Sequence, residues 1–198
     1  MMYSSETGSW DASGVPFAAK WREQYNAGVY WNGAINWFSN WGSGDSVYYN
    51  VDEERLGIIP LLPIPEGSYW STPEFRFYGE SRGHLHLVQT HYRTKRVDVY
   101  EMEGDYSGWF LKHSVDPYAV GIPRAPWFGI FNVLCVVRME RDEESYLVLN
   151  IPGKILRYNF GDRTLKKIFD VEVGTLHEAP LIYSWCGSYQ YIESLARV

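Results

Sequence analysis

The sequence predicts an all-β fold, either a β-propeller or a propeller fragment built from four-stranded antiparallel meander blades. Aromatic residues, which favour strands, make up 17% of the 198 residues. Eighteen glycines and ten prolines interrupt the chain often, as a fold of short strands requires. A four-strand pattern recurs with a period of about 50 to 60 residues, which is typical of propeller blades. We therefore expect about three full blades and partial blades at both ends.

The first full blade is predicted at about residues 28–60. Its clearest signal is Asn32-Gly33, because a two-residue type I′ turn needs positive φ at both of its positions. A Gly/Ser-rich loop and an acidic turn provide the next two connections. The four predicted strands lie at 28–31, 34–38, 46–50 and 56–60.

The second and third blades are predicted at about 75–115 and 131–171. The spacing from Gly33 to Val47 is fourteen residues, and the spacing from Gly83 to Val97 is the same. The second blade has predicted strands at 75–78, 84–89, 96–101 and 109–115. The third, which matches more loosely, has them at 131–137, 145–150, 154–160 and 164–171.

Both ends of the chain carry incomplete blades, predicted at 1–10 and 179–196. YSSETGSW (3–10) has the pattern of the last two strands of an earlier blade, and APLIYSW (179–185) that of an opening strand. These fragments could pair and close a small four-bladed ring, or the chain could be an arc of a larger propeller. Both alternatives stay open. FAAKWREQYN (17–26) contains helix formers and is predicted to form a short helix within a loop.

The longer connections, which share one side of each blade, are rich in aromatic residues and arginine. Long loops on a rigid β scaffold commonly carry binding function, and protein-binding hot spots favour these residue types. The alternative is that such aromatics only fill gaps between blades. We expect a target protein to bind this aromatic loop face through Trp41, Tyr69, Trp70, Tyr92, Arg93, Tyr118, Arg124 and Trp127.

No catalytic or metal-binding motif stands out. His84 and His86 lie on one face of a predicted strand, as a pair of metal ligands could, but the repeat aligns them with Ala34 and Asn36. We therefore expect structural histidines and no metal site. Cys135 lies within the apolar run VLCVV, which disfavours a reactive thiolate.

The carboxylates of the tight turns are predicted to form a solvated face, because no apolar pocket is evident that would raise a pKa. The sequence therefore indicates a protein that is not an enzyme and needs no cofactor. A glycoside hydrolase built on a propeller remains a distant alternative.

Charge and hydropathy limit the partners. The net charge of −6 argues against a nucleic-acid binder, which would present a basic face. We expect no membrane association, since the N-terminus lacks a secretory pattern and no apolar run reaches spanning length. The predicted location is the cytoplasm, the nucleus or both.

Six segments in order resemble the C-terminal domain of plant F-box proteins, the F-box-associated, kelch-like β-propeller group. The resemblance runs from Tyr3 to Ala196, nearly end to end. The segments are YSSETGSW, YWNGAINWFS, YYNVDEERLGIIPL, GHLHLV, KILRYNFGDRTLKKIFDV and YQYIESLA.

The resemblance implies a non-catalytic module that recruits substrates to an SCF-type ubiquitin ligase. In that family an F-box docks on a Skp1-like adaptor, while the propeller captures the target and other subunits transfer ubiquitin. No F-box helices precede Tyr3, so a Skp1-like adaptor is expected as a partner only if an F-box is present elsewhere in the full-length protein. A short natural paralogue would instead act as an adaptor or competitor without recruiting the ligase.

A carbohydrate-binding propeller is the second class of function, because tryptophan and tyrosine platforms suit sugar rings. The acidic charge and the absence of secretory features favour protein over glycan as the ligand. The sequence names no target and leaves open the oligomeric state and whether the propeller closes.

Overall fold

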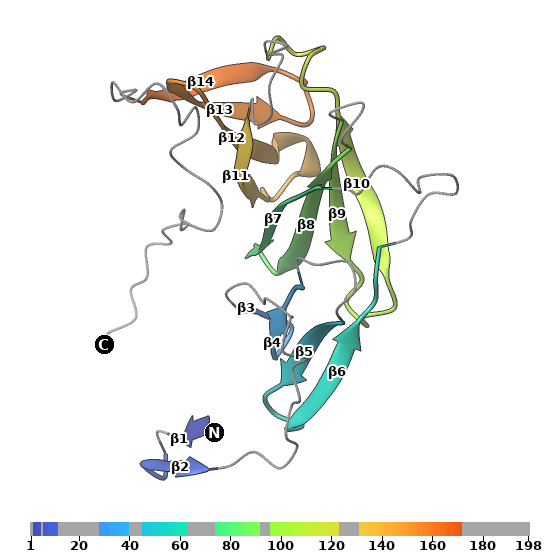
Figure 1. Ribbon diagram of the computed structural model, residues 1–198, viewed down its shortest axis with the longest axis vertical. Helices are drawn as coiled ribbons and strands as arrows, with labels where there is room; N and C mark the ends of the chain where they lie inside the picture. Colours follow the sequence, from blue (N-terminus) through green and yellow to red (C-terminus); the bar gives the residue numbers. More distant parts are fainter. Residues whose placement is uncertain are drawn as a thin grey trace. The chain divides into compact units, whose positions relative to one another are not determined.

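The computed structural model describes residues 2–4, 6–11, 28–39, 45–62, 74–91, 96–122 and 131–171. These residues form fourteen β-strands and a single 3-10 helix, η1 (Asp142–Glu144) (Figure 1). Within these ranges no helix has the length and apolar character needed to cross a membrane. The predicted helix at 17–26 and the predicted strand at 179–185 lie outside the described residues.

The first four-stranded sheet has the predicted turn at its beginning. Asn32 and Gly33 adopt φ values of 52° and 71°, as the two-residue hairpin requires. The sheet follows the chain in the order β3-β4-β5-β6, and every neighbouring pair is antiparallel. Its strands are β3 (Val29–Trp31), β4 (Ala34–Trp37), β5 (Ser46–Asn50) and β6 (Arg55–Ile59).

Two further sheets repeat this antiparallel meander. The second contains β7 (Glu74–Ser81), β8 (His84–Thr90), β9 (Val97–Met102) and β10 (Trp109–Val115). The third contains β11 (Asn132–Val137), β12 (Tyr146–Ile151), β13 (Lys154–Asn159) and β14 (Leu165–Asp170). Near the N-terminus β1 (Met2–Ser4) and β2 (Ser9–Asp11) pair as a hairpin, where the sequence predicts part of an earlier blade. The predicted fold class is confirmed.

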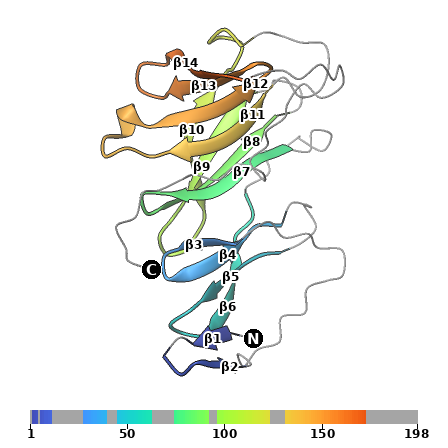
Figure 2. The same ribbon diagram turned by 90° about the vertical axis from the view of Figure 1, so that its left-hand side faces the viewer.

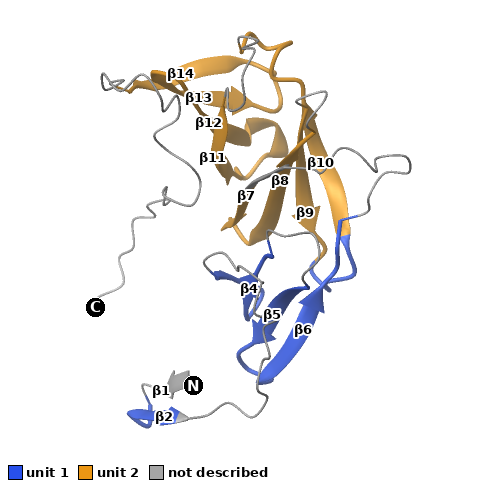
Figure 3. Ribbon diagram, viewed as in Figure 1, with its two compact units in different colours: residues 1–62, 104–108 blue, residues 63–103, 109–198 orange. Residues whose placement is uncertain are grey.

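The chain divides into two compact units (Figure 3). Unit 1 comprises residues 1–62 together with 104–108, the turn that joins β9 to β10. Unit 2 comprises 63–103 and 109–198 and therefore contains the second and third sheets.

In unit 1 the turn side chain Tyr106 packs against the first sheet. Its ring stacks on Tyr48 with the centroids 4.0 Å apart, and it meets the edge of Trp31 at 5.1 Å. Asn36, which is fully buried, accepts a hydrogen bond from the Tyr106 hydroxyl. The turn thus supplies an aromatic side chain that completes the packing of this face.

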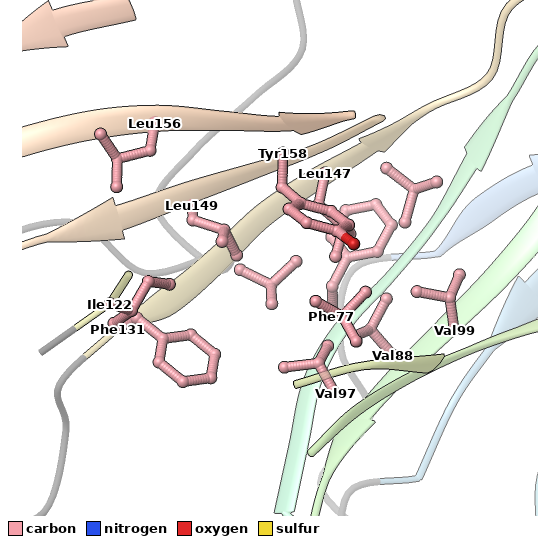
Figure 4. Close-up of a cluster of buried hydrophobic side chains, with 13 residues drawn as sticks. Phe77, Val88, Val97, Val99, Ile122, Phe131, Leu147, Leu149, Leu156 and Tyr158 are labelled. Carbon is pink, nitrogen blue, oxygen red and sulfur yellow. The ribbon is translucent and has the colours of Figure 1, made fainter. Parts of the chain in front are cut away.

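In unit 2 the second and third sheets (Figure 2) share one hydrophobic core (Figure 4). On β9, β12 and β13 the core residues alternate along the strand, as a period of two dictates. The second sheet contributes Phe77, Val88, Val97, Val99 and Val115, and the third contributes Val133, Val136, Leu147, Leu149, Leu156 and Tyr158. Ile122 and Phe131, which flank the connection between the sheets, complete the core. This face-to-face packing gives the loops of unit 2 a rigid base.

Candidate protein-interaction surface

Two connections of the predicted binding face, the 92–95 loop and the turn that contains Tyr118, start from one end of the second sheet, where β8 ends, β9 begins and β10 ends. The pairing of Val97 with both Thr90 and Val115 places these three strand ends side by side. Of the eight predicted partner-binding residues, the structure describes only Tyr118. The other seven, Trp41, Tyr69, Trp70, Tyr92, Arg93, Arg124 and Trp127, lie outside the described residues.

A buried carboxylate, Asp98 of β9, organises this end of the sheet. Asp98 is only 1% exposed to solvent. The Ser114 hydroxyl donates a 2.6 Å hydrogen bond to Oδ1, while Nε2 of His91 lies 2.7 Å from Oδ2. The Arg96 guanidinium donates to the same Oδ2 over 3.0 Å. Burial acts to raise the pKa of Asp98, but these three hydrogen bonds outweigh it, and the net pKa is lowered. Asp98 therefore carries its negative charge inside the sheet.

The two residues that hold Oδ2 are also the two ends of a loop. His91 follows β8 and Arg96 precedes β9, and the His91 amide donates a 3.0 Å hydrogen bond to the Arg96 carbonyl. Residues 92–95, which include the predicted binding residues Tyr92 and Arg93, are the chain between these fixed ends. Asp98 thus anchors both ends of one predicted recognition loop.

Tyr118 lies in a turn after β10 that is also held by hydrogen bonds. Asp116 Oδ1 accepts from the Tyr118 amide over 2.9 Å. The Ile122 amide donates to the Pro117 carbonyl over 3.0 Å, and the Ile122 side chain is buried in the core of unit 2. Gly121 has a φ of 93°, which glycine adopts without strain. Tyr118 itself is half-buried. The hydrogen bonds of this turn fix the backbone position from which its side chain extends.

The Asp98 cluster does not have the geometry of a nucleophilic site. Nucleophilic catalysis by serine needs a base within hydrogen-bond reach of the hydroxyl. Here Ser114 and His91 bond to different oxygens of Asp98, and the described hydrogen bonds include none between Ser114 and His91. The arrangement positions a loop and shows no activated hydroxyl.

A second buried carboxylate, Glu101, lies on the opposite face of β9 and near its other end. Its side chain is 7% exposed and lies 2.9 Å from the Arg138 guanidinium, which follows β11 of the third sheet. Nδ1 of His84 is 2.8 Å from the other carboxylate oxygen. Arg138 and Lys112 also pair with Asp142, whose pKa is lowered chiefly by the hydrogen bond from Lys112. This network joins the two sheets of unit 2.

The predicted pair of histidines has two different environments. His84 bonds to Glu101, whereas His86 is 1% exposed and neither of its ring nitrogens has a hydrogen-bond partner. Burial, followed by the nearby cations, lowers the pKa of His86 to about 3, so its ring is neutral at physiological pH. No group of three or more histidine, cysteine, aspartate or glutamate residues suited to a metal ion occurs within the described ranges.

Cys135 on β11 is half-buried and unpaired in a disulfide. Burial raises the pKa of its thiol to about 11, so the thiolate needed for nucleophilic attack is scarce at neutral pH. The side chain has the environment of a small apolar residue.

Sequence reasoning missed the two buried carboxylates, although a signal was present. In RVDVYE (96–101) Asp98 and Glu101 interrupt a run of strand formers, and strand alternation places them on opposite faces. A charge within a strand that is buried on both faces needs a partner. The partners of Glu101 come from other strands, and the sequence shows no pattern that points to them.

Comparison with known proteins gives a sequence match along the whole of this chain. The chain is 32% identical over 214 aligned residues to F-box protein At5g07610 of Arabidopsis thaliana, and the alignment covers 100% of this chain and 50% of that protein. The chain thus spans about half the length of this relative. No protein-family model matches. Among solved structures, YCF48 bound to D1 peptide is similar at a TM-score of 0.32 and 14% identity, covering 77% of this chain and 56% of that one.

Proposed function

This chain is a relative of plant F-box proteins along its whole length, and on that premise we propose that it is a non-catalytic protein-recognition module. The observation that carries the proposal is the match to an F-box protein across all of the chain. The proposed role resembles that of the substrate-recruiting part of an SCF-type ubiquitin ligase, acting in the cytoplasm or nucleus.

The proposed target-binding surface is the aromatic loop face. Two of its connections begin and end on fixed points: the 92–95 loop at the Asp98 cluster, and the Tyr118 turn at buried Ile122. Fixed loop ends favour recognition because less conformational entropy is lost when a partner binds. Aromatic and arginine side chains carried on such loops are typical of protein-binding hot spots.

The proposed module catalyses no reaction of its own. The two buried carboxylates of unit 2 have positional roles: Asp98 holds a loop, and Glu101 joins two sheets. Any ubiquitin transfer would take place on other subunits. Engagement of a Skp1-like adaptor would require an F-box in the full-length protein, whereas a short paralogue would act as an adaptor or competitor.

A peptide selection tests the recognition function. The purified chain is used to enrich binders from a displayed random-peptide library, and the same protein is applied to a glycan array. We expect specific peptides and no glycan signal. Trp41→Ala combined with Tyr118→Ala should weaken peptide binding at least tenfold, and Tyr30→Ala serves as a matched control because Tyr30 is 66% exposed on β3.

Glycan binding that the Trp41 and Tyr118 changes abolish would overturn the proposal in favour of a carbohydrate-binding propeller. Ligase recruitment is tested separately by co-purifying the full-length protein with a Skp1-like adaptor. Adaptor binding supports the receptor role, and its absence limits the function to target or partner binding.

A further inference from the structure

The third sheet has an outer face that is distinct from the aromatic loop face. Leu156 and Tyr158 of β13 point into the core of unit 2, so the alternation of the strand directs Ile155 and Arg157 to the opposite side. Register extends this outer face across β12 and β14. It comprises Tyr146, Val148, Ile155, Arg157, Lys166 and Phe169.

This outer face combines aromatic rings with cations. The Arg157 guanidinium carbon lies 3.8 Å from the centre of the Tyr146 ring, a close cation–π contact. Arg157 also pairs in register with Lys166, so two cations lie on neighbouring strands. Arginine and tyrosine are enriched in binding hot spots, and here both lie on strands and not on loops.

The outermost strand, β14, adds exposed apolar surface. A register shift between Leu156 and Ile155 leaves Ile168 without a cross-strand partner, and Phe169 pairs with Ile155. Ile168 and Phe169 are 54% and 63% exposed. Within the described sheet β14 pairs only with β13, so its outer hydrogen-bonding edge can accept an added strand.

The charge of this region is opposite in sign to that of the whole chain. Residues 154–170 contain five lysines or arginines and two aspartates, a net charge of +3, whereas the chain carries −6. Lys167 pairs with Asp170, but Lys166 forms no ion pair with any described residue. A local positive field attracts acidic segments of a partner.

We propose that the outer face of β12–β14 binds an extended acidic segment of a partner protein, which adds to the edge of β14. Carboxylates of the segment meet Lys166 and Arg157, and a large apolar side chain contacts Phe169. The inference rests on the proposed recognition function and assigns it a second surface with a stated chemistry. Single-stranded RNA would also suit aromatics and cations, but the edge of β14 and the exposed side chains of Ile168 and Phe169 suit an extended peptide better.

The test compares charge reversals at two adjacent lysines. Lys166→Glu changes the outer face, whereas Lys167→Glu makes the same change on the opposite side of β14, where Lys167 pairs with Leu156. Displayed random peptides are selected on the wild-type protein, and their synthetic copies are titrated against both variants and against Phe169→Ala. Thermal melts confirm folding, which these exposed positions should leave intact.

We expect a class of selected peptides in which aspartate or glutamate adjoins a large apolar residue. Their affinity should fall at least tenfold with Lys166→Glu and with Phe169→Ala, change less than twofold with Lys167→Glu, and weaken as salt rises from 50 to 500 mM.

Three results overturn the inference. If the affinity of the selected peptides depends on Trp41 and Tyr118 but not on Lys166, the proposed function stands and the binding role of the β12–β14 face is wrong. If the wild-type protein enriches no peptides, the proposed recognition function and the proposed surface on β12–β14 are both wrong. If a labelled oligouridine displaces the acidic peptides at comparable affinity, the surface binds nucleic acid.

Discussion

The hydroxyl of Tyr106 donates a 2.9 Å hydrogen bond to Oδ1 of Asn36, across 70 positions of sequence. Asn36 in turn donates to the backbone carbonyls of Val29, Trp31 and Ala34. A buried amide is thus satisfied on both its oxygen and its nitrogen. The β9–β10 turn therefore belongs to the polar and aromatic packing of unit 1.

Replacing Tyr106 by phenylalanine should destabilise unit 1. The ring can still stack on Tyr48, but the buried Asn36 oxygen loses its donor, which costs about 1–2 kcal/mol. The measurement is urea unfolding followed by tryptophan fluorescence. The control is Tyr30→Phe, which removes an exposed hydroxyl and should change the unfolding free energy by less than about 0.5 kcal/mol. Equal effects of the two changes would contradict this account.

The glycine at position 57 should not tolerate a methyl group. A Cβ added there would lie 2.2 Å from Cζ of Tyr48, the ring on which Tyr106 stacks. The Tyr48 ring must therefore move, and overpacking of this kind costs about 1–3 kcal/mol. Gly57→Ala should lower the midpoint of urea unfolding.

Gly104→Ala is the matched control for this change. Gly104 lies in the same unit, and a Cβ added to it meets nothing within 4 Å. If Gly57→Ala is as harmless as Gly104→Ala, the stacked arrangement of Tyr48 and Tyr106 is wrong.

The strands could be predicted because their signals are local. Asn-Gly is one of the few dipeptides that favour a type I′ turn, which identifies the turn at Asn32-Gly33. The strands in HLHLVQ and KILRYN can be recognised from their period of two alone. The position of Tyr106 could not be predicted, since its partners are Asn36 and Tyr48 and no local pattern relates the three. Glu101 illustrates the same limit, because its partner Arg138 lies 37 positions away, directly after the first strand of the third sheet.

His86 should make the protein sensitive to acid. Its pKa is lowered to about 3 in the folded state from 6.5, chiefly by burial. The unfolded chain therefore binds the proton first, so stability is complete above about pH 6.5 and is lost as pH falls toward 3. The slope for one such group is about 1.4 kcal/mol per pH unit.

Replacing His86 by leucine should remove this slope. The urea unfolding free energies of the wild type and the variant are compared at pH 7.5 and pH 5. We expect the wild type to lose about 2 kcal/mol more than the variant between these values. At pH 7.5 the change should cost little, since neither ring nitrogen has a hydrogen-bond partner to lose. Identical pH dependence in the two proteins would show that His86 is not held neutral.

The candidate surface could be predicted only in part. The aromatic and arginine residues in the long connections identified Tyr118 and the 92–95 loop as candidates. They give no information on the hydrogen bonds that fix the ends of these segments. That role belongs to Asp98, whose three partners come from the end of β8, the start of β9 and the interior of β10. Only the pairing of the three strands brings these groups to one carboxylate.

Loss of the Asp98 charge should loosen the 92–95 loop without unfolding the sheet. Asp98→Asn keeps the size of the side chain but weakens the hydrogen bonds with His91 and Arg96, which hold the two ends of the loop. Hydrogen bonds to a charged group contribute about 1.5–3 kcal/mol. Local opening should therefore become at least about tenfold more frequent, because each 1.4 kcal/mol is a factor of ten in population.

Trypsin can report this opening, because Arg93 and Lys95 are cleavage sites within the loop. Limited proteolysis with mass-spectrometric identification of fragments should show cleavage after these two residues about tenfold faster in Asp98→Asn than in the wild type. Asp116→Asn is the control, since Asp116 is exposed and accepts from the backbone of the Tyr118 turn instead. Unchanged cleavage after Arg93 and Lys95 would mean that Asp98 does not position the loop. Faster cleavage at every site would mean that it supports the whole sheet.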